Sequence, residues 1–168
     1  MAILEKIEFA KLDSCRFIGK SVYAPPFSGE VFGGLWAKSE DVFHAIDKLK
    51  EYATGEVHNV ALLTWDKYTE QDKLMGYTIG RFMRADTPVP EGLDFIDLPE
   101  TFIAKGWVKG EFEDMIQTAE SLTSGAVEKQ DKYELTWNFM AEVYTEETIP
   151  KDGASSVLGY YIACKKKK

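Results

Sequence analysis

The stretch that decides the fold is YELTWNFMAEVY, at residues 133–144. Apolar residues recur there at every second position, which predicts a β-strand whose successive side chains point to opposite faces. One face would belong to the core and carry Leu135, Trp137, Phe139, Ala141 and Val143. The other would carry Asn138, Met140, Glu142 and Tyr144. A carboxylate between a methionine and a tyrosine, on a strand whose reverse side is buried, is a candidate ligand contact.

The composition indicates a globular domain without a nucleic-acid or membrane partner. Of the 168 residues, 45% are hydrophobic and 13% aromatic, which is enough for a core. The net charge of -8 opposes phosphate binding, and the lysines at 165–168 are predicted to form a solvated tail. No apolar run approaches the roughly 18 residues of a membrane span. No signal peptide is evident at the N-terminus, so we expect a cytoplasmic protein.

No motif for a cofactor or a metal is present. Cys15 and Cys164 are the only cysteines and are predicted to be small buried apolar residues, not a disulfide framework. His44 and His58 have no partner at metal-ligand spacing. The chain has neither a G-x-S-x-G motif nor a glycine-rich phosphate loop. We therefore predict no cofactor and no metal site.

The first half of the chain is predicted to contain strands around one helix. Residues 7–23 are predicted to form one strand, bent near Gly19. Residues 24–36 have the Pro and Gly residues of a loop but hold three aromatic rings. A helix should begin at Ser39 and end near Gly55. A hairpin of strands at 60–65 and 74–84 and a linker at 86–92 would follow.

The same order then recurs in the second half. A strand is expected at 98–107, a helix from Phe112 to near Gly125, the strand at 133–144, a turn at 150–153 and a strand at 157–164. FIGK at 17–20 resembles FIAK at 102–105, and GYTIG at 76–80 resembles GYYIA at 159–163. These matches predict an internal repeat, about 7–85 and 94–165, within a single domain of residues 1–168.

The repeat predicts an α+β fold made of duplicated strand-helix-strand-strand modules. Joined side by side, they would form a curved antiparallel sheet with both helices on one side. The opposite face would then form a ligand groove between the halves, because binding sites favour concave seams between modules. Glu142 and Tyr144 would face this groove if Leu135, Trp137 and Phe139 pack on the second helix.

Three segments in this order resemble a known family: ALLTWD at 61–66, LPETFIA at 98–104 and FMAEVY at 139–144. The chain resembles a GyrI-like small-molecule-binding domain, related to the effector-binding domains of multidrug-sensing bacterial transcription factors. The resemblance implies a buried glutamate among aromatic rings that receives lipophilic, often cationic, compounds. Glu142 is the matching position. Because no helix-turn-helix segment is present, we expect that the chain does not control transcription by itself.

The candidate ligand-binding residues are mostly aromatic. They are Tyr23, Phe27, Trp36, Trp65, Trp107, Asn138, Met140, Glu142 and Tyr144. Flat rings suit planar ligands and cations, and methionine adapts to varied shapes. Tyr23 could line the groove, and Phe27 could lie on a lid if residues 24–38 form one; the alternative for both is surface packing. The alternative for each Trp is a place in the core, for Met140 plain packing, for Glu142 an exposed strand carboxylate, and for Tyr144 a place on the surface.

The favoured function is the binding of lipophilic, aromatic or cationic molecules, for sequestration or sensing. The alternative is an enzyme, since the resemblance also extends to stand-alone relatives that hydrolyse cyclopropane-bearing, DNA-alkylating natural products. Glu142 and Tyr144 would then be catalytic, with Glu142 activating water or protonating the strained ring. A third alternative is a protein-interaction module whose apolar groove accepts a peptide. The sequence does not identify a particular protein partner.

Overall fold

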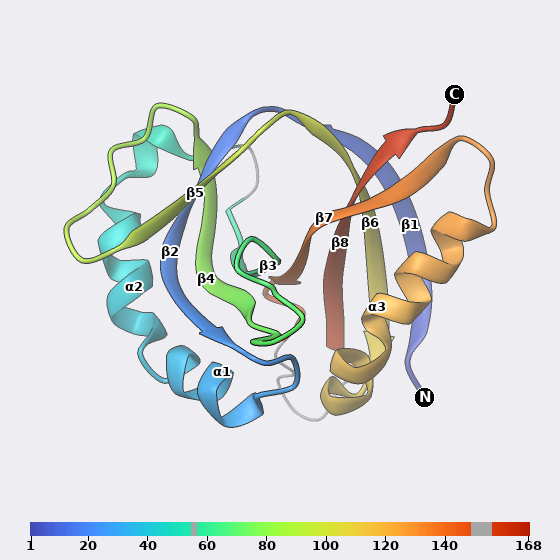
Figure 1. The fold of residues 1–168 in the computed structure, drawn as a ribbon, viewed down its shortest axis with the longest axis horizontal. Helices are drawn as coiled ribbons and strands as arrows, with labels where there is room; N and C mark the ends of the chain where they lie inside the picture. Colours follow the sequence, from blue (N-terminus) through green and yellow to red (C-terminus); the bar gives the residue numbers. More distant parts are fainter. Residues whose placement is uncertain (55–56, 149–155) are drawn as a thin grey trace. The chain divides into compact units, whose positions relative to one another are not determined.

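The computed structural model describes residues 1–54, 57–148 and 156–168. It is an α+β protein in which all the described strand pairs are antiparallel, as the sequence predicted. The chain divides into two compact units (Figure 1). The N-terminal unit is Asp13–Glu100, and the C-terminal unit combines Met1–Leu12 with Thr101–Lys168.

The C-terminal unit is a four-stranded sheet with a helix on one face. Its strand order is β1 (Ile3–Leu12), β6 (Thr101–Gly110), β8 (Ser156–Lys166) and β7 (Tyr133–Tyr144). Helix α3 (Phe112–Glu128) is amphipathic, because its buried residues recur every fourth position, at Met115, Ala119, Thr123 and Val127. Val127 packs with Ala104 and Cys164, which places α3 on the sheet face that those two residues share.

The N-terminal unit repeats this arrangement. Its strand order is β5 (Asp94–Leu98), β2 (Cys15–Ala24), β4 (Met75–Arg84) and β3 (Asn59–Thr64). Helix α1 (Gly29–Trp36), helix α2 (Ser39–Asp47) and the short 3₁₀ helix η1 (Lys50–Tyr52) follow β2, as α3 follows β6. β3 and β4 form the expected hairpin. Tyr77 and Ile79 on β4 correspond to Tyr160 and Ile162 on β8, the pairs that the sequence match aligned.

The outer strand of each unit comes from the other half of the predicted repeat. β1 pairs with β6 of the second half, whereas β5 pairs with β2 of the first half. The prediction of one strand over 7–23 is therefore wrong. The chain breaks at Asp13 and Ser14, and the strands on either side belong to different units. β5 was not predicted; only its last residue, Leu98, was assigned to a strand, the one expected over 98–107.

Helix boundaries differ from the predictions where glycine was weighted too heavily. α1 lies in the predicted loop of 24–36; it buries Leu35 and stacks Phe32 on Tyr77, with ring centroids 4.3 Å apart. α3 continues through Gly125 to Glu128. α2 ends at Asp47, earlier than expected. The predicted helix end at Gly55 and the turn at 150–153 lie outside the described residues.

The C-terminal lysines do not form the predicted solvated tail as a whole. β8 extends to Lys166, so two of the four lysines belong to the sheet. The Lys165 ammonium lies 3.3 Å from a carboxylate oxygen of Glu134, and the Lys166 ammonium lies 5.1 Å from the ring centre of Phe102. An ion pair with Glu134 on β7 places the Lys165 ammonium beside the sheet, and the ring of Phe102 does the same for Lys166.

The contact of α3 with β6 depends on a glycine. A Cβ atom added at Gly106 would lie 2.1 Å from the Thr123 hydroxyl oxygen, far inside van der Waals contact. Thr123 is fully buried, and its hydroxyl has no hydrogen-bond partner among the described residues. The absence of a side chain at Gly106 therefore sets how closely α3 approaches the sheet.

We expect Gly106→Ala to lower the free energy of unfolding by about 1–3 kcal/mol, because overpacking displaces α3. Gly125→Ala is the matched control, since an added Cβ there meets nothing within 4 Å. That control should raise stability by about 0.5–1 kcal/mol through helix propensity. Adding Thr123→Ala to Gly106→Ala should recover part of the loss. Chemical denaturation measures all three, and equal effects of the two glycine substitutions would contradict the close contact.

Candidate functional site

A bulge interrupts β7 in the middle of the stretch that carries the candidate glutamate. Leu135 pairs with Cys164 of β8, but the next pair is Met140 with Ile162. The four residues 136–139 therefore stand where β8 has only Ala163, so β7 carries three extra residues. Trp137 lies inside this bulge with a φ of 60°, in the left-handed region that non-glycine residues rarely adopt.

An odd number of extra residues reverses the alternation of faces. Leu135 packs in the cluster beneath α3 together with its pair partner Cys164. After the bulge, Met140 and Glu142 lie opposite Ile162 and Tyr160, which share the face of Cys164 along β8. Met140, Glu142 and Tyr144 therefore project to the same side of the sheet as α3.

This geometry corrects two predictions. Glu142 lies on the helix side of its sheet and not on the reverse face, where the groove was expected. Trp137 was predicted to be core but is 40% exposed, because the bulge removes it from the regular pleat. Phe139, Ala141 and Val143 are buried as predicted, and Leu135 is half-buried.

Glu142 belongs to a compact cluster of side chains contributed by β7 and β8. The Tyr144 hydroxyl donates a hydrogen bond of 2.6 Å to Oε2 of Glu142. The Tyr160 hydroxyl, from the residue paired with Glu142, lies 3.5 Å from the sulfur of Met140. Met140 is only 3% exposed, whereas Glu142 and Tyr144 are half-buried. One carboxyl group thus lies among a thioether and two phenol rings.

Burial raises the pKa of Glu142, because the ionised form loses contact with water. The hydrogen bond from Tyr144 acts in the opposite direction and lowers this pKa, but burial is the larger cause. A bound proton or a positively charged neighbour stabilises such a carboxyl group. The cluster can therefore accept a cation or hold an exchangeable proton.

Tyr160 is a member of this cluster that the sequence prediction missed. Its signal was present in the match of GYTIG with GYYIA, which places Tyr160 on a strand equivalent to β4. The missing information was the register, since only the pairing of Glu142 with Tyr160 brings the two together.

The other predicted residues of the C-terminal unit lie elsewhere. Trp107 pairs with Gly159, and its ring lies beside that glycine, as Val143 does, on the sheet face away from α3. Its indole nitrogen donates a hydrogen bond of 3.2 Å to Glu8. Asn138 is exposed within the bulge. Neither residue is brought to Glu142 within this unit.

In the N-terminal unit the predicted aromatic residues form separate contacts. The indole nitrogen of Trp36 donates a 2.8 Å hydrogen bond to the Tyr77 hydroxyl. Trp65 is half-buried, and its ring meets Tyr68 edge to face.

Tyr23 and Phe27 lie near the end of β2. The Lys67 ammonium lies 3.9 Å from the ring centre of Tyr23. Burial and the nearby carboxylate of Asp66 raise the pKa of Tyr23. Phe27 is fully exposed, with a φ of 66°.

No three His, Cys, Asp or Glu side chains among residues 1–54, 57–148 and 156–168 gather as metal ligands. In the same part of the chain, no helix is both long and apolar enough to cross a membrane. Cys15 and Cys164 are both free and buried, and burial raises the pKa of each thiol to about 11. These thiols are therefore poor nucleophiles.

Comparison with known families identifies the chain. The model of the integron-associated effector-binding proteins matches residues 8–164, nearly the whole length. The chain belongs to this family. The GyrI-like resemblance drawn from the sequence is thereby confirmed. No match was found among curated protein sequences.

Solved structures share the fold of this effector-binding protein. An integron cassette protein from the mobile metagenome of Vibrio cholerae is 14% identical, with a TM-score of 0.58, covering 98% of this chain and 99% of that one. SAV2435, solved bound to tetraphenylphosphonium, is 13% identical, with a TM-score of 0.67 and coverages of 95% and 94%. A hydrolase from Listeria innocua is 11% identical, with a TM-score of 0.53 and coverages of 97% and 93%.

The raised pKa of Glu142 predicts a pH-dependent stability. The folded protein binds this proton more tightly than the unfolded chain does, so the free energy of unfolding falls as pH rises from the unfolded pKa through the folded pKa. Each unit by which folding raises the pKa removes about 1.4 kcal/mol at neutral pH. Glu142→Gln cannot ionise and should unfold at a temperature about 2–4 °C higher at pH 7.5.

At pH 4 the two proteins should have nearly equal melting temperatures, because Glu142 is then largely protonated in both states. Glu146→Gln, at an exposed position just beyond β7, is the matched control and should shift the melting temperature little at either pH. Thermal unfolding followed by circular dichroism provides the measurement. A Glu142→Gln protein that is less stable than the parent at pH 7.5 would contradict a desolvated carboxylate.

Proposed function

We propose that this protein binds lipophilic cations and that the carboxylate of Glu142 provides the complementary charge. The observation that carries the proposal is the position of Glu142, half-buried beside the Tyr144 hydroxyl and the thioether of Met140. A desolvated carboxylate is costly alone, and a cation with apolar substituents offsets that cost without returning water to the site. Loss of the proton from Glu142 would accompany binding.

The surroundings of Glu142 fit ligands of varied shape. Tyr144 and Tyr160 offer aromatic rings, whose faces attract cations, and Met140 has a flexible and polarisable side chain. The family is described by effector binding, and its structural neighbour SAV2435 was solved with tetraphenylphosphonium, a lipophilic cation. Both support a role in the sequestration or sensing of such compounds. The preference for lipophilic cations is inferred from the side chains that surround Glu142.

Tetraphenylphosphonium is the first probe, measured by isothermal titration calorimetry at pH 7.5. We expect Glu142→Gln to weaken its binding by about tenfold or more, because a desolvated charge pair loses one partner. Binding of neutral triphenylphosphine oxide should change little. Glu146→Gln is the control and should bind both compounds like the parent. If Glu142→Gln weakened the binding of both compounds equally, the substitution would have changed the shape of the site and not only its charge. That result would contradict the proposal.

The affinity for the cation should also rise with pH while Glu142 titrates, because only the ionised carboxylate offers the charge. Titrations in two buffers of different ionisation enthalpy measure the protons released on binding. A release that is present in the parent and absent in Glu142→Gln is expected. An affinity independent of pH between 4.5 and 8 would count against Glu142 as the cation's partner.

A second candidate function is hydrolysis of cyclopropane-bearing compounds, which the raised pKa of Glu142 favours. Protonated Glu142 could donate its proton to one carbon of the cyclopropane as a ring C–C bond breaks. The hydroxyl of a water molecule would add to the other carbon of that bond, and the remaining proton of the water would restore the acid. Turnover of such a substrate, followed by mass spectrometry as a gain of one water, tests this function. Glu142→Gln should abolish turnover; turnover unchanged in that variant would exclude Glu142 as the acid.

A further inference from the structure

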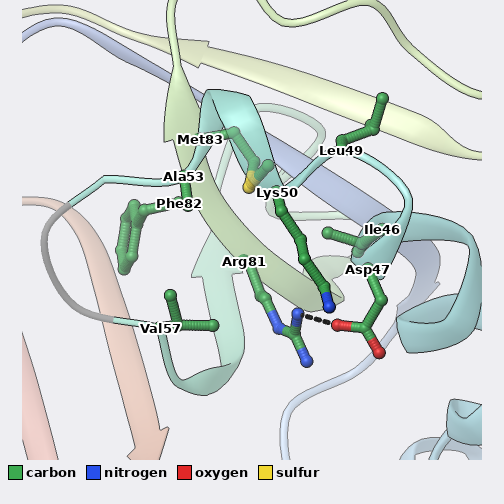
Figure 2. Close-up of a pocket in the computed structure, with 9 residues that line it drawn as sticks. All are labelled: Ile46, Asp47, Leu49, Lys50, Ala53, Val57, Arg81, Phe82 and Met83. Carbon is green, nitrogen blue, oxygen red and sulfur yellow. Dashed lines mark hydrogen bonds and ion pairs between the residues drawn. The ribbon is translucent and has the colours of Figure 1, made fainter.

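The N-terminal unit contains a pocket that is independent of Glu142. Its volume is about 290 Å³, and it lies between β4, the end of α2 and the segment through η1 (Figure 2). Six apolar side chains line it: Ile46, Leu49, Ala53, Val57, Phe82 and Met83. Val57 is 57% exposed, although its side chain is apolar. The pocket thus leaves apolar surface accessible to a ligand.

Charged groups lie at one side of this pocket. Figure 2 shows the ends of Lys50, Arg81 and Asp47 gathered there, with Phe82 and Val57 at the other side. One N–H group of Arg81 donates a hydrogen bond of 2.5 Å to Asp47, and two others reach Asn59. The Lys50 ammonium forms no ion pair with a described residue. Arg81 and Asp47 balance each other, so the lining keeps one positive charge.

The guanidinium of Arg81 is held in place before any ligand arrives. Its side chain is only 15% exposed, and its central carbon lies 5.1 Å from the ring centre of Phe43 on α2. Ile46 is buried, and Met83 is buried on β4. Because rigid elements supply these walls, the pocket loses little conformational entropy on binding.

We propose that this pocket binds a small carboxylate with an apolar tail or ring. The apolar walls take the tail, and Lys50 takes the carboxylate, because Arg81 is already paired with Asp47. A volume of about 290 Å³ holds on the order of ten non-hydrogen atoms, if each occupies about the share of a water molecule. This ligand class is opposite in charge to the cation proposed for Glu142.

The experiment uses octanoate with the full-length, ¹⁵N-labelled protein. Octanoate should shift the amide resonances of residues 46–53 and 81–83, and octylammonium should not. Lys50→Glu should weaken octanoate binding at least about fivefold, since it replaces an attractive charge with a repulsive one. Lys48→Glu is the matched control, because Lys48 is exposed nearby but does not line the pocket. It should weaken binding less than twofold.

Two further results separate this site from the Glu142 site. Glu142→Gln should leave octanoate binding unchanged, so each proposal can fail alone. Both lysine variants carry exposed substitutions, and circular dichroism checks that they fold. The proposal is overturned if octanoate and octylammonium bind equally, if Lys50→Glu and Lys48→Glu weaken octanoate alike, or if the shifted resonances lie outside the pocket.

Discussion

The three extra residues in β7 decide which side chains share a face with α3. Without them, the face that begins at Leu135 would continue through odd-numbered residues, and Glu142 would point to the other side of the sheet. With them, the strand packs Leu135 under α3 and then presents Met140, Glu142 and Tyr144 to that same side. The positive φ of Trp137 is the local cost of this switch. The candidate site therefore depends on a backbone irregularity 5 residues before the glutamate.

The carboxyl group at position 142 is destabilising by itself, which is informative. Burial favours its neutral form, and the hydrogen bond from Tyr144 offsets only part of that effect. An apolar residue at this position would serve the fold better. The carboxyl group has a physical use if something exchanges with its proton, and both candidate functions supply such an exchange. A bound cation replaces the proton, whereas a hydrolase would transfer it.

Much of the fold could be predicted from local patterns, and the failures have physical causes. β3, β4, β7 and β8 were found because apolar alternation and turn residues mark them. α1 was missed because Gly29, Gly33 and Gly34 have low helix propensity, and packing of Phe32 and Leu35 overrides it. The split into β1 and β2 was missed because only Asp13 and Ser14 separate the two strands, a break too short to stand out in the sequence.

The candidate site was less predictable than the fold. Glu142 and Tyr144 were predicted to share a face and do so, because they are two residues apart and the bulge lies before both. The core position of Trp137 was wrong because a bulge leaves no trace in a periodic pattern. The pairing of Glu142 with Tyr160 depends on register, which one sequence does not contain. The pocket beside η1 was not anticipated, since Arg81, Lys50 and Val57 come from three separate segments.

The exchange of outer strands has a consequence for the order of events during synthesis. The residues of the N-terminal unit, Asp13–Glu100, form an unbroken segment that contains the strand pairs β2–β4, β2–β5 and β3–β4. β1 is synthesised before its partner β6, which begins only at Thr101. β1 therefore waits for this partner while the residues of an entire unit are made. Its many charged residues, which include Glu5, Lys6, Glu8 and Lys11, keep this waiting segment soluble and discourage pairing with other chains.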